Sequence, residues 1–155
     1  MPLVTEILKA KNVFFLGRDT DYITVTEASL KLKEISYINS SSYPAGELKH
    51  GFLALVDSET LSIFLCTNND LLPKIISSIH EVHARGGKTV LITNLKVSRS
   101  DNFCVDKIIP INDFGQNVMP ITSIKFFQWL AYYTSITLGI NPDKPKNLAK
   151  SVTVE

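Results

Sequence analysis

Short apolar runs recur along the chain and are separated by polar turns. The runs that we interpret as strands are residues 13–17, 53–56, 62–66, 89–93 and 105–110. The first of them, VFFLG, is continuous and does not alternate with polar residues. A continuous apolar run is typical of a strand that is covered on both faces, as in a parallel sheet.

Helical patterns lie between and around these strands. A short helix is expected at 2–9, a second one follows the turn at 17–21, and a third runs to about Arg85, where Gly86-Gly87 ends it. The segment Thr67–Asp70 precedes the third helix and is suited to cap it. Strands that alternate with helices predict an α/β fold, a three-layer, doubly wound parallel sheet flanked by helices on both faces.

A last helix is expected at 118–138, and it is apolar around most of its circumference. Such a helix is buried in a core, buried in a subunit interface, or spans a membrane. Gln128, Thr134, Ser135 and the early Pro120 argue against a membrane. The helix is therefore expected to lie in a core or at an interface.

The second helix carries an unusual charge pattern. At about 100° per residue, Glu27, Lys31 and Glu34 form one stripe, with apolar residues on both sides of it. Buried charge is costly unless it is paired or used. The stripe is therefore either a set of helix-stabilising ion pairs or part of a catalytic site. The other side of the helix is expected to be solvated and consists of Thr26, Ser29, Lys33 and Ser36.

The segment GELKHG at residues 46–51 follows this helix and brings a carboxylate, an ammonium group and an imidazole close together in sequence. This combination suits proton transfer, although His50 could also be an ordinary loop residue. His80 and His83 in HEVH are one residue too close for the HExxH zinc motif, so no metal site is expected.

Composition narrows the class of protein. The 155 residues are 45% hydrophobic and 20% charged, which is typical of one soluble globular domain. A net charge of +1 gives no electrostatic case for nucleic acid or an anionic membrane. Cys66 and Cys104 lie in apolar runs and are expected to be buried, reduced thiols of a cytoplasmic protein. The N-terminus lacks a signal-peptide pattern.

Two longer motifs carry a resemblance. They are SLKLKEISYINSSSYPAGELKHGFLAL at residues 29–55 and NLAKSVTVE at residues 147–155. From about Phe14 to Glu155, the chain resembles the second sugar-isomerase (SIS) lobe of the glucosamine-6-phosphate synthases, the isomerizing glutamine–fructose-6-phosphate aminotransferases. The resemblance implies a flavodoxin-like SIS domain at 1–140 and an active-site tail at 141–155. Composition alone would make that tail a flexible end.

The resemblance also implies a chemistry, in which fructose 6-phosphate and ammonia give glucosamine 6-phosphate without a cofactor. Lys150 would form an imine with the keto carbon, and Glu34 would carry a proton between C1 and C2. His50 would open the sugar ring in the neighbouring subunit's site, which implies a homodimer. Supporting positions near the base and the sugar are Glu27, Lys31 and the main chain of Ala149.

Some of the family's parts are missing or altered. The loop Thr67–Asp70, where SIS lobes bind phosphate, has one hydroxyl and a carboxylate that would repel the anion. The first SIS lobe and the glutaminase domain are not in this sequence, so an excised, inactive fragment is expected. Asp19 replaces a glycine of the family's usual GRG turn, and Asn39, Pro44 and Phe52 are further departures.

Two alternatives stay open. One is a non-catalytic SIS module that binds sugar phosphates as a sensor, and the other is a dimerisation lobe. Either would have no need for a carboxyl-terminal lysine that is suited to imine chemistry.

Overall fold

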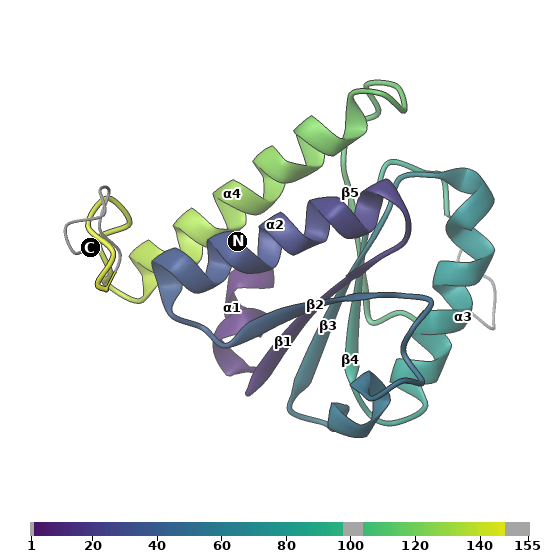
Figure 1. Cartoon of the computed structure of the whole chain (residues 1–155), viewed down its shortest axis with the longest axis horizontal. Helices are drawn as coiled ribbons and strands as arrows, with labels where there is room; N and C mark the ends of the chain where they lie inside the picture. The colour runs from purple at the N-terminus through teal and green to yellow at the C-terminus, as the bar shows by residue number, and fades with distance from the viewer. Residues whose placement is uncertain (1, 98–103, 148–155) are drawn as a thin grey trace, which may run out of the picture.

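In the computed structural model, residues 2–97 and 104–147 are described, and they form one parallel sheet between two layers of helices (Figure 1). In chain order the elements are α1 (Pro2–Lys9), β1 (Asn12–Gly17), α2 (Thr20–Ser36), β2 (Ser40–Pro44), the 3₁₀ helix η1 (Phe52–Leu55), β3 (Thr60–Cys66), the 3₁₀ helix η2 (Asn69–Leu71), α3 (Leu72–His83), β4 (Lys88–Thr93), β5 (Lys107–Pro110) and α4 (Met119–Thr137).

The sheet has the strand order β2-β1-β3-β4-β5, and every neighbouring pair is parallel. The central strands β1, β3 and β4 are buried almost throughout, as their continuous apolar runs predict. The three-layer, doubly wound α/β fold is therefore confirmed. Because β1 leads first to β2 on one side and then to β3 on the other, the strand order reverses between β1 and β3.

Each face of the sheet has its own hydrophobic core. Figure 1 shows α2 and α4 side by side on one face, with α1 beneath them and α3 on the other face. Phe15, Leu32 and Phe127 meet in the first core. Phe52 and Ile79 belong to the second core, which η1 and α3 close. Each fully buried side chain of this size contributes about 1.5–3 kcal/mol.

The predicted strand at 53–56 is wrong, because this segment is the 3₁₀ helix η1. Its one buried side chain is Phe52, which packs edge-on to Phe14 with ring centroids 5.0 Å apart. The centroids of the Phe52 and Tyr43 rings are 5.2 Å apart. A strand that the pattern missed, β2, pairs with β1 at this edge of the sheet instead. β2 is polar and only partly buried, so it lacks the apolar run that marked the other strands.

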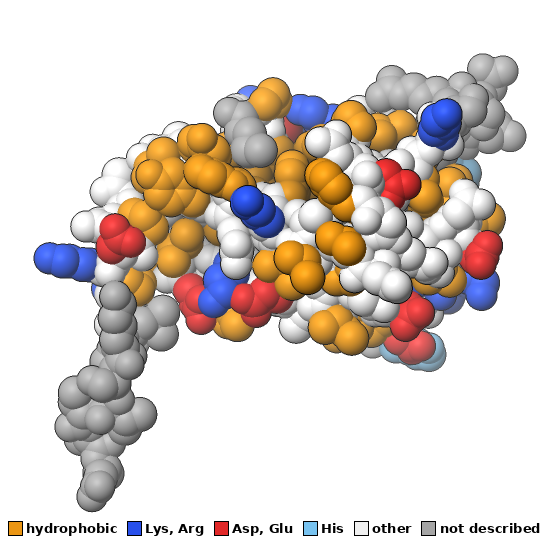
Figure 2. Space-filling model, turned by 90° about the horizontal axis from the view of Figure 1, so that it is seen from above, with side chains coloured by type: hydrophobic (Ala, Val, Ile, Leu, Met, Phe, Trp, Pro, Cys, Tyr) orange, Lys and Arg blue, Asp and Glu red, His pale blue; other side chains and the backbone are white. Residues whose placement is uncertain are grey.

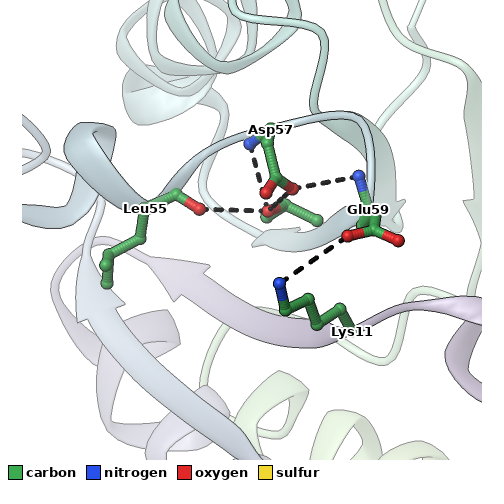
Figure 3. A network of polar contacts seen from close by, with 5 residues as sticks. Lys11, Leu55, Asp57 and Glu59 are labelled. Carbon is green, nitrogen blue, oxygen red and sulfur yellow. Dashed lines mark hydrogen bonds and ion pairs between the residues drawn. The ribbon is translucent and has the colours of Figure 1, made fainter.

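A polar turn connects η1 to β3 (Figure 3). The Asp57 carboxylate accepts hydrogen bonds from the Glu59 N–H at 3.0 Å and the Thr60 hydroxyl at 2.8 Å. These bonds, the hydroxyl first, lower the pKa of Asp57. The same hydroxyl lies 3.1 Å from the Leu55 carbonyl, and Lys11 lies 3.8 Å from Glu59. The turn thereby fixes the start of β3 beside β1.

Helix α4 is a core helix along one side only. Phe127, Leu130 and Ala131 are buried, as expected. The other side carries exposed aromatic and aliphatic side chains, with exposed fractions of 40–49% at Trp129, Tyr132, Tyr133 and Ile136. Among the described residues, no helix combines the length and the apolar character that a membrane crossing needs.

Candidate active site

A small cleft lies where the strand order reverses, at the carboxyl ends of β1 and β3. Its volume is about 50 Å³, and its lining residues are Arg18, Asp19, Thr20, Asp21, Thr67, Asn68, Leu71, Gln116 and Pro120. In open α/β sheets, ligands bind at this position. Gly17 shapes the cleft, because a Cβ there would lie 2.6 Å from the backbone carbonyl carbon of Asp21.

A carboxylate of the chain itself lies in this cleft, bonded to the loop where the resemblance predicts a phosphate. Asp21 is 4% exposed, and it accepts hydrogen bonds of 2.7 Å from both the N–H and the hydroxyl of Thr67. Burial raises the pKa of Asp21, while the bonds to Thr67 oppose that rise. The Asn68 side chain is engaged as well, with the Asp70 N–H at 3.0 Å. The hydroxyl and the amide that would meet a phosphate therefore already have an anionic partner.

Asp21 was not among the predicted site residues. The sequence offered only one signal for it, a carboxylate four residues after the glycine that ends a strand. Nothing in the chain order pairs it with Thr67, which is 46 residues away. The pairing arises because β1 and β3 are neighbours in the sheet.

The charged stripe of α2 is the second feature of the site. Lys31 Nζ lies 2.8 Å from Glu34 Oε2 and 3.5 Å from Glu27 Oε1. The three side chains are 28–36% exposed. The hydrogen bond to Glu34 is the main reason why the pKa of Lys31 is raised. The predicted stripe is thus a connected set of ion pairs that remains open to a ligand on one side.

The opposite side of α2 is not solvated as predicted. Ser29 and Ser36 are buried, whereas Thr26 and Lys33 are exposed. The Ser40 hydroxyl of β2 donates to the Ser29 carbonyl at 2.9 Å. The unpredicted edge strand therefore covers this side of the helix and pairs with its polar groups.

His50 lies apart from the stripe, in the loop between β2 and η1. Its imidazole is 76% exposed, and Nε2 lies 3.5 Å from Glu47 Oε2. In the described part of the chain, no hydrogen bond or ion pair joins His50 to Glu27, Lys31 or Glu34. Within a single chain, the structure therefore does not bring the predicted acid–base histidine to the predicted base.

The predicted tail residues Ala149 and Lys150 lie outside the described residues. The chain just before them returns to the end of α2. The Lys146 N–H donates to the Tyr37 hydroxyl at 2.7 Å, and Lys146 Nζ lies 4.5 Å from the centre of the Tyr37 ring. Tyr37 is the C-cap residue of α2, less than one turn beyond Glu34.

The remaining predicted features are a histidine pair and two thiols. Within residues 2–97 and 104–147, no three His, Cys, Asp or Glu side chains are grouped to hold a metal ion. Burial raises the pKa of the Cys66 thiol to about 12. Cys104 is exposed, so the prediction that both thiols are buried is wrong for this residue. It precedes β5, outside the apolar part of that run.

The strand order 2-1-3-4-5 and the cleft at the reversal point define a flavodoxin-like, doubly wound α/β domain. The chain belongs to the SIS domain family, whose sequence profile matches residues 6–138.

Relatives narrow the comparison further. The chain is 50% identical, over 97% of its length, to the isomerizing glutamine–fructose-6-phosphate aminotransferase of Caldanaerobacter subterraneus subsp. tengcongensis. It is 43% identical, over 94% of its length, to that of Clostridium acetobutylicum. The chain spans about a quarter of the length of these relatives, 25% and 24%.

Solved structures agree with this placement. The C-terminal domain of glucosamine-fructose-6-phosphate aminotransferase from Francisella tularensis has a TM-score of 0.82 and 35% identity, over 92% of this chain and 40% of that one. A protein from Clostridium novyi, named for a tagatose-6-phosphate ketose/aldose isomerase activity, has a TM-score of 0.79 and 23% identity, over 97% of this chain and 40% of that one. At that identity, the second likeness concerns the fold alone.

Proposed function

We propose that this chain is the C-terminal isomerase lobe of an isomerizing glutamine–fructose-6-phosphate aminotransferase. In that role it helps to convert fructose 6-phosphate and ammonia into glucosamine 6-phosphate. The observation that carries the proposal is the stripe of α2, which is a connected set of charges accessible from one side. Lys31 holds both carboxylates in fixed positions beside this accessible side, which suits a site that moves protons.

In this proposal, Glu34 is the base that moves a proton between C1 and C2. Its carboxylate has one oxygen held by Lys31 at 2.8 Å, which fixes its orientation. Glu27 holds the same ammonium from the preceding turn, at 3.5 Å. Orientation matters because a proton-transfer group must lie within hydrogen-bond reach of the carbon-bound proton.

Lys150 is the proposed imine-forming group, and the Ala149 main chain is proposed to run along the sugar. The contacts of Lys146 with Tyr37 support this, since they bring the described end of the chain to the C-terminal end of α2. From there, a lysine four residues further on is within reach of a sugar bound beside Glu34.

His50 is the proposed ring-opening group of a neighbouring subunit. Its exposed position, away from the stripe of its own chain, supports an action in a second copy and therefore a homodimer. Ring opening needs a group that can both donate and accept a proton, and imidazole is the side chain suited to that role.

The phosphate group is proposed to bind elsewhere. The Asp21 carboxylate already accepts the hydrogen bonds of the Thr67 hydroxyl and N–H, and the charge of this carboxylate would repel a phosphate. A first SIS lobe would supply the phosphate cradle, and a glutaminase domain would supply ammonia. Without these two parts, the chain by itself is expected to be inactive. We also propose that the enzyme is cytoplasmic.

A second candidate is an SIS module that serves association only. The exposed aromatic side of α4 favours it, with Trp129 stacked on Tyr133 at 5.7 Å. Figure 2, seen from above, shows hydrophobic side chains spread over this face of the molecule. Catalysis and association are not exclusive, so the test must report on chemistry.

The test is a chimera, in which this chain replaces the matching quarter of the Caldanaerobacter relative. We expect the chimera to form glucosamine 6-phosphate. Glu34→Gln should lower the rate at least a hundredfold, because the amide keeps the size but cannot accept the proton. Solvent deuterium exchange at C1 or C2 measures this step directly. Glu6→Gln on α1 is the matched control and should leave the rate unchanged.

Two results would remove the catalytic proposal in favour of the association module. One is an inactive chimera that is folded and has the parent's oligomeric state. The other is undiminished hydrogen exchange in the Glu34→Gln chimera.

A further inference from the structure

We propose that the cleft between α3 and the loop after β2 binds a phosphate-bearing small molecule. Its volume is about 240 Å³, compared with about 50 Å³ for the cleft at the reversal point. The charged and hydroxyl-bearing side chains of its lining are Arg18, Lys49, Lys74, Ser77, Ser78 and Glu81. Arg18 lines both clefts. The rest of this lining lies on the α3 face, whereas the stripe belongs to α2, so this site is additional to the proposed function.

The charge of the cleft is unbalanced. Three cationic side chains line it, but only one carboxylate does. The Glu81 carboxylate lies 3.9 Å from the Lys49 ammonium group, which is a long contact, and the Lys49 side chain is mostly exposed. Among the described residues, no carboxylate lies within 4.0 Å of Arg18 or Lys74. A partly buried guanidinium without a counter-charge is costly, and a bound anion would remove that cost.

Arg18 is held in place rather than free to move to water. Its Nη2 donates to the Ala45 carbonyl at 3.1 Å. The buried Ser78 hydroxyl donates to the same carbonyl at 2.7 Å and so fixes the loop against α3. A Cβ on Gly46 would lie 3.0 Å from Arg18 Nη1, so this glycine leaves room for the guanidinium. The cation is therefore preorganised at the wall of the cleft, as anion sites require.

The donor set points to phosphate. Arginine offers a planar fork of N–H donors that matches the oxygens of a phosphate, and lysine adds a point charge. Ser77 is exposed and adds a hydroxyl at the rim. The bound molecule would also act on the loop of residues 45–51, which carries His50. Occupancy would then add to the hydrogen bond from Ser78 that already holds that loop against α3.

The experiment is an NMR titration of the whole chain with inorganic phosphate, followed by a hexose 6-phosphate. We expect amide shifts at residues 45–49 and 74–81. Lys74→Gln should weaken phosphate binding about tenfold, because it removes a charged donor. Glu81→Gln should tighten it about threefold, because it removes the one carboxylate of the cleft. Lys125→Gln on α4 makes the same charge change on another face and should have no effect. Circular dichroism verifies that each variant is folded.

Three outcomes would overturn the site. Equal weakening by Lys74→Gln and Lys125→Gln would mean non-specific attraction. Shifts confined to residues 67–71 would place the phosphate in the cleft at the reversal point. No shift in the millimolar range would mean that the cleft does not bind phosphate.

Discussion

Asp19 gives the sharpest stability prediction, because its backbone has φ 54° and ψ −129°. This conformation suits glycine, and a residue with a Cβ is strained there. The resembled family usually has a glycine at this position, in a GRG turn. Asp19→Gly should therefore stabilise the chain, although most substitutions destabilise proteins.

The magnitude follows from two opposing terms. Strain of this kind costs about 1–3 kcal/mol, and glycine makes folding less favourable by about 0.5–1 kcal/mol through backbone entropy. The net gain is about 1 kcal/mol, which corresponds to a rise in Tm of about 2–4 °C for a domain of this size. The backbone bonds of the turn persist, since the Asp19 carbonyl still accepts from the Tyr22 N–H at 3.0 Å.

Urea unfolding followed by circular dichroism measures the gain. Asp19→Ala is the control, because it removes the carboxylate, whose charge also raises the pKa of Asp21, but keeps the Cβ. If Asp19→Ala stabilises as much as Asp19→Gly, charge and not strain is the cause. A loss of stability in Asp19→Gly would refute the argument outright.

Two further predictions concern buried groups. Thr67→Val should cost about 2 kcal/mol in urea unfolding at pH 7, because it removes the hydroxyl bonded to the Asp21 carboxylate. Burial raises the folded-state pKa of Asp21 above 3.8, so this cost should shrink as the pH falls through that pKa and the carboxylate is protonated. The control is Thr134→Val, which removes a hydroxyl bonded to a carbonyl and should show no such pH dependence. Cys104→Ser should abolish rapid labelling of the native chain by a disulfide reagent, because Cys66 is buried and its pKa is about 12. Rapid native labelling of the Cys104→Ser chain would contradict this.

The buried strands were predictable because burial on both faces leaves a direct trace in the sequence. β1, β3 and β4 each appear as apolar runs. β2 leaves no such trace, because an edge strand has one neighbour and tolerates polar residues. Its omission also explains the wrong prediction for Ser29, since the helix face that β2 covers was expected to meet water.

The candidate site was predictable only where its residues are close in sequence. Helical spacing correctly places Glu27, Lys31 and Glu34 in one connected stripe. The bond between Asp21 and Thr67 depends on the order of strands in the sheet, which no local pattern contains. The roles of Glu34 and His50 come from the resemblance and remain proposals.

Both outermost strands of the described sheet end in proline. Pro44 closes β2 opposite Gly17, and Pro110 closes β5 opposite Thr93. Because proline has no N–H to donate, neither edge offers a full ladder to an incoming strand. We therefore expect this sheet to resist growth into fibrils by edge-to-edge joining of copies of the chain.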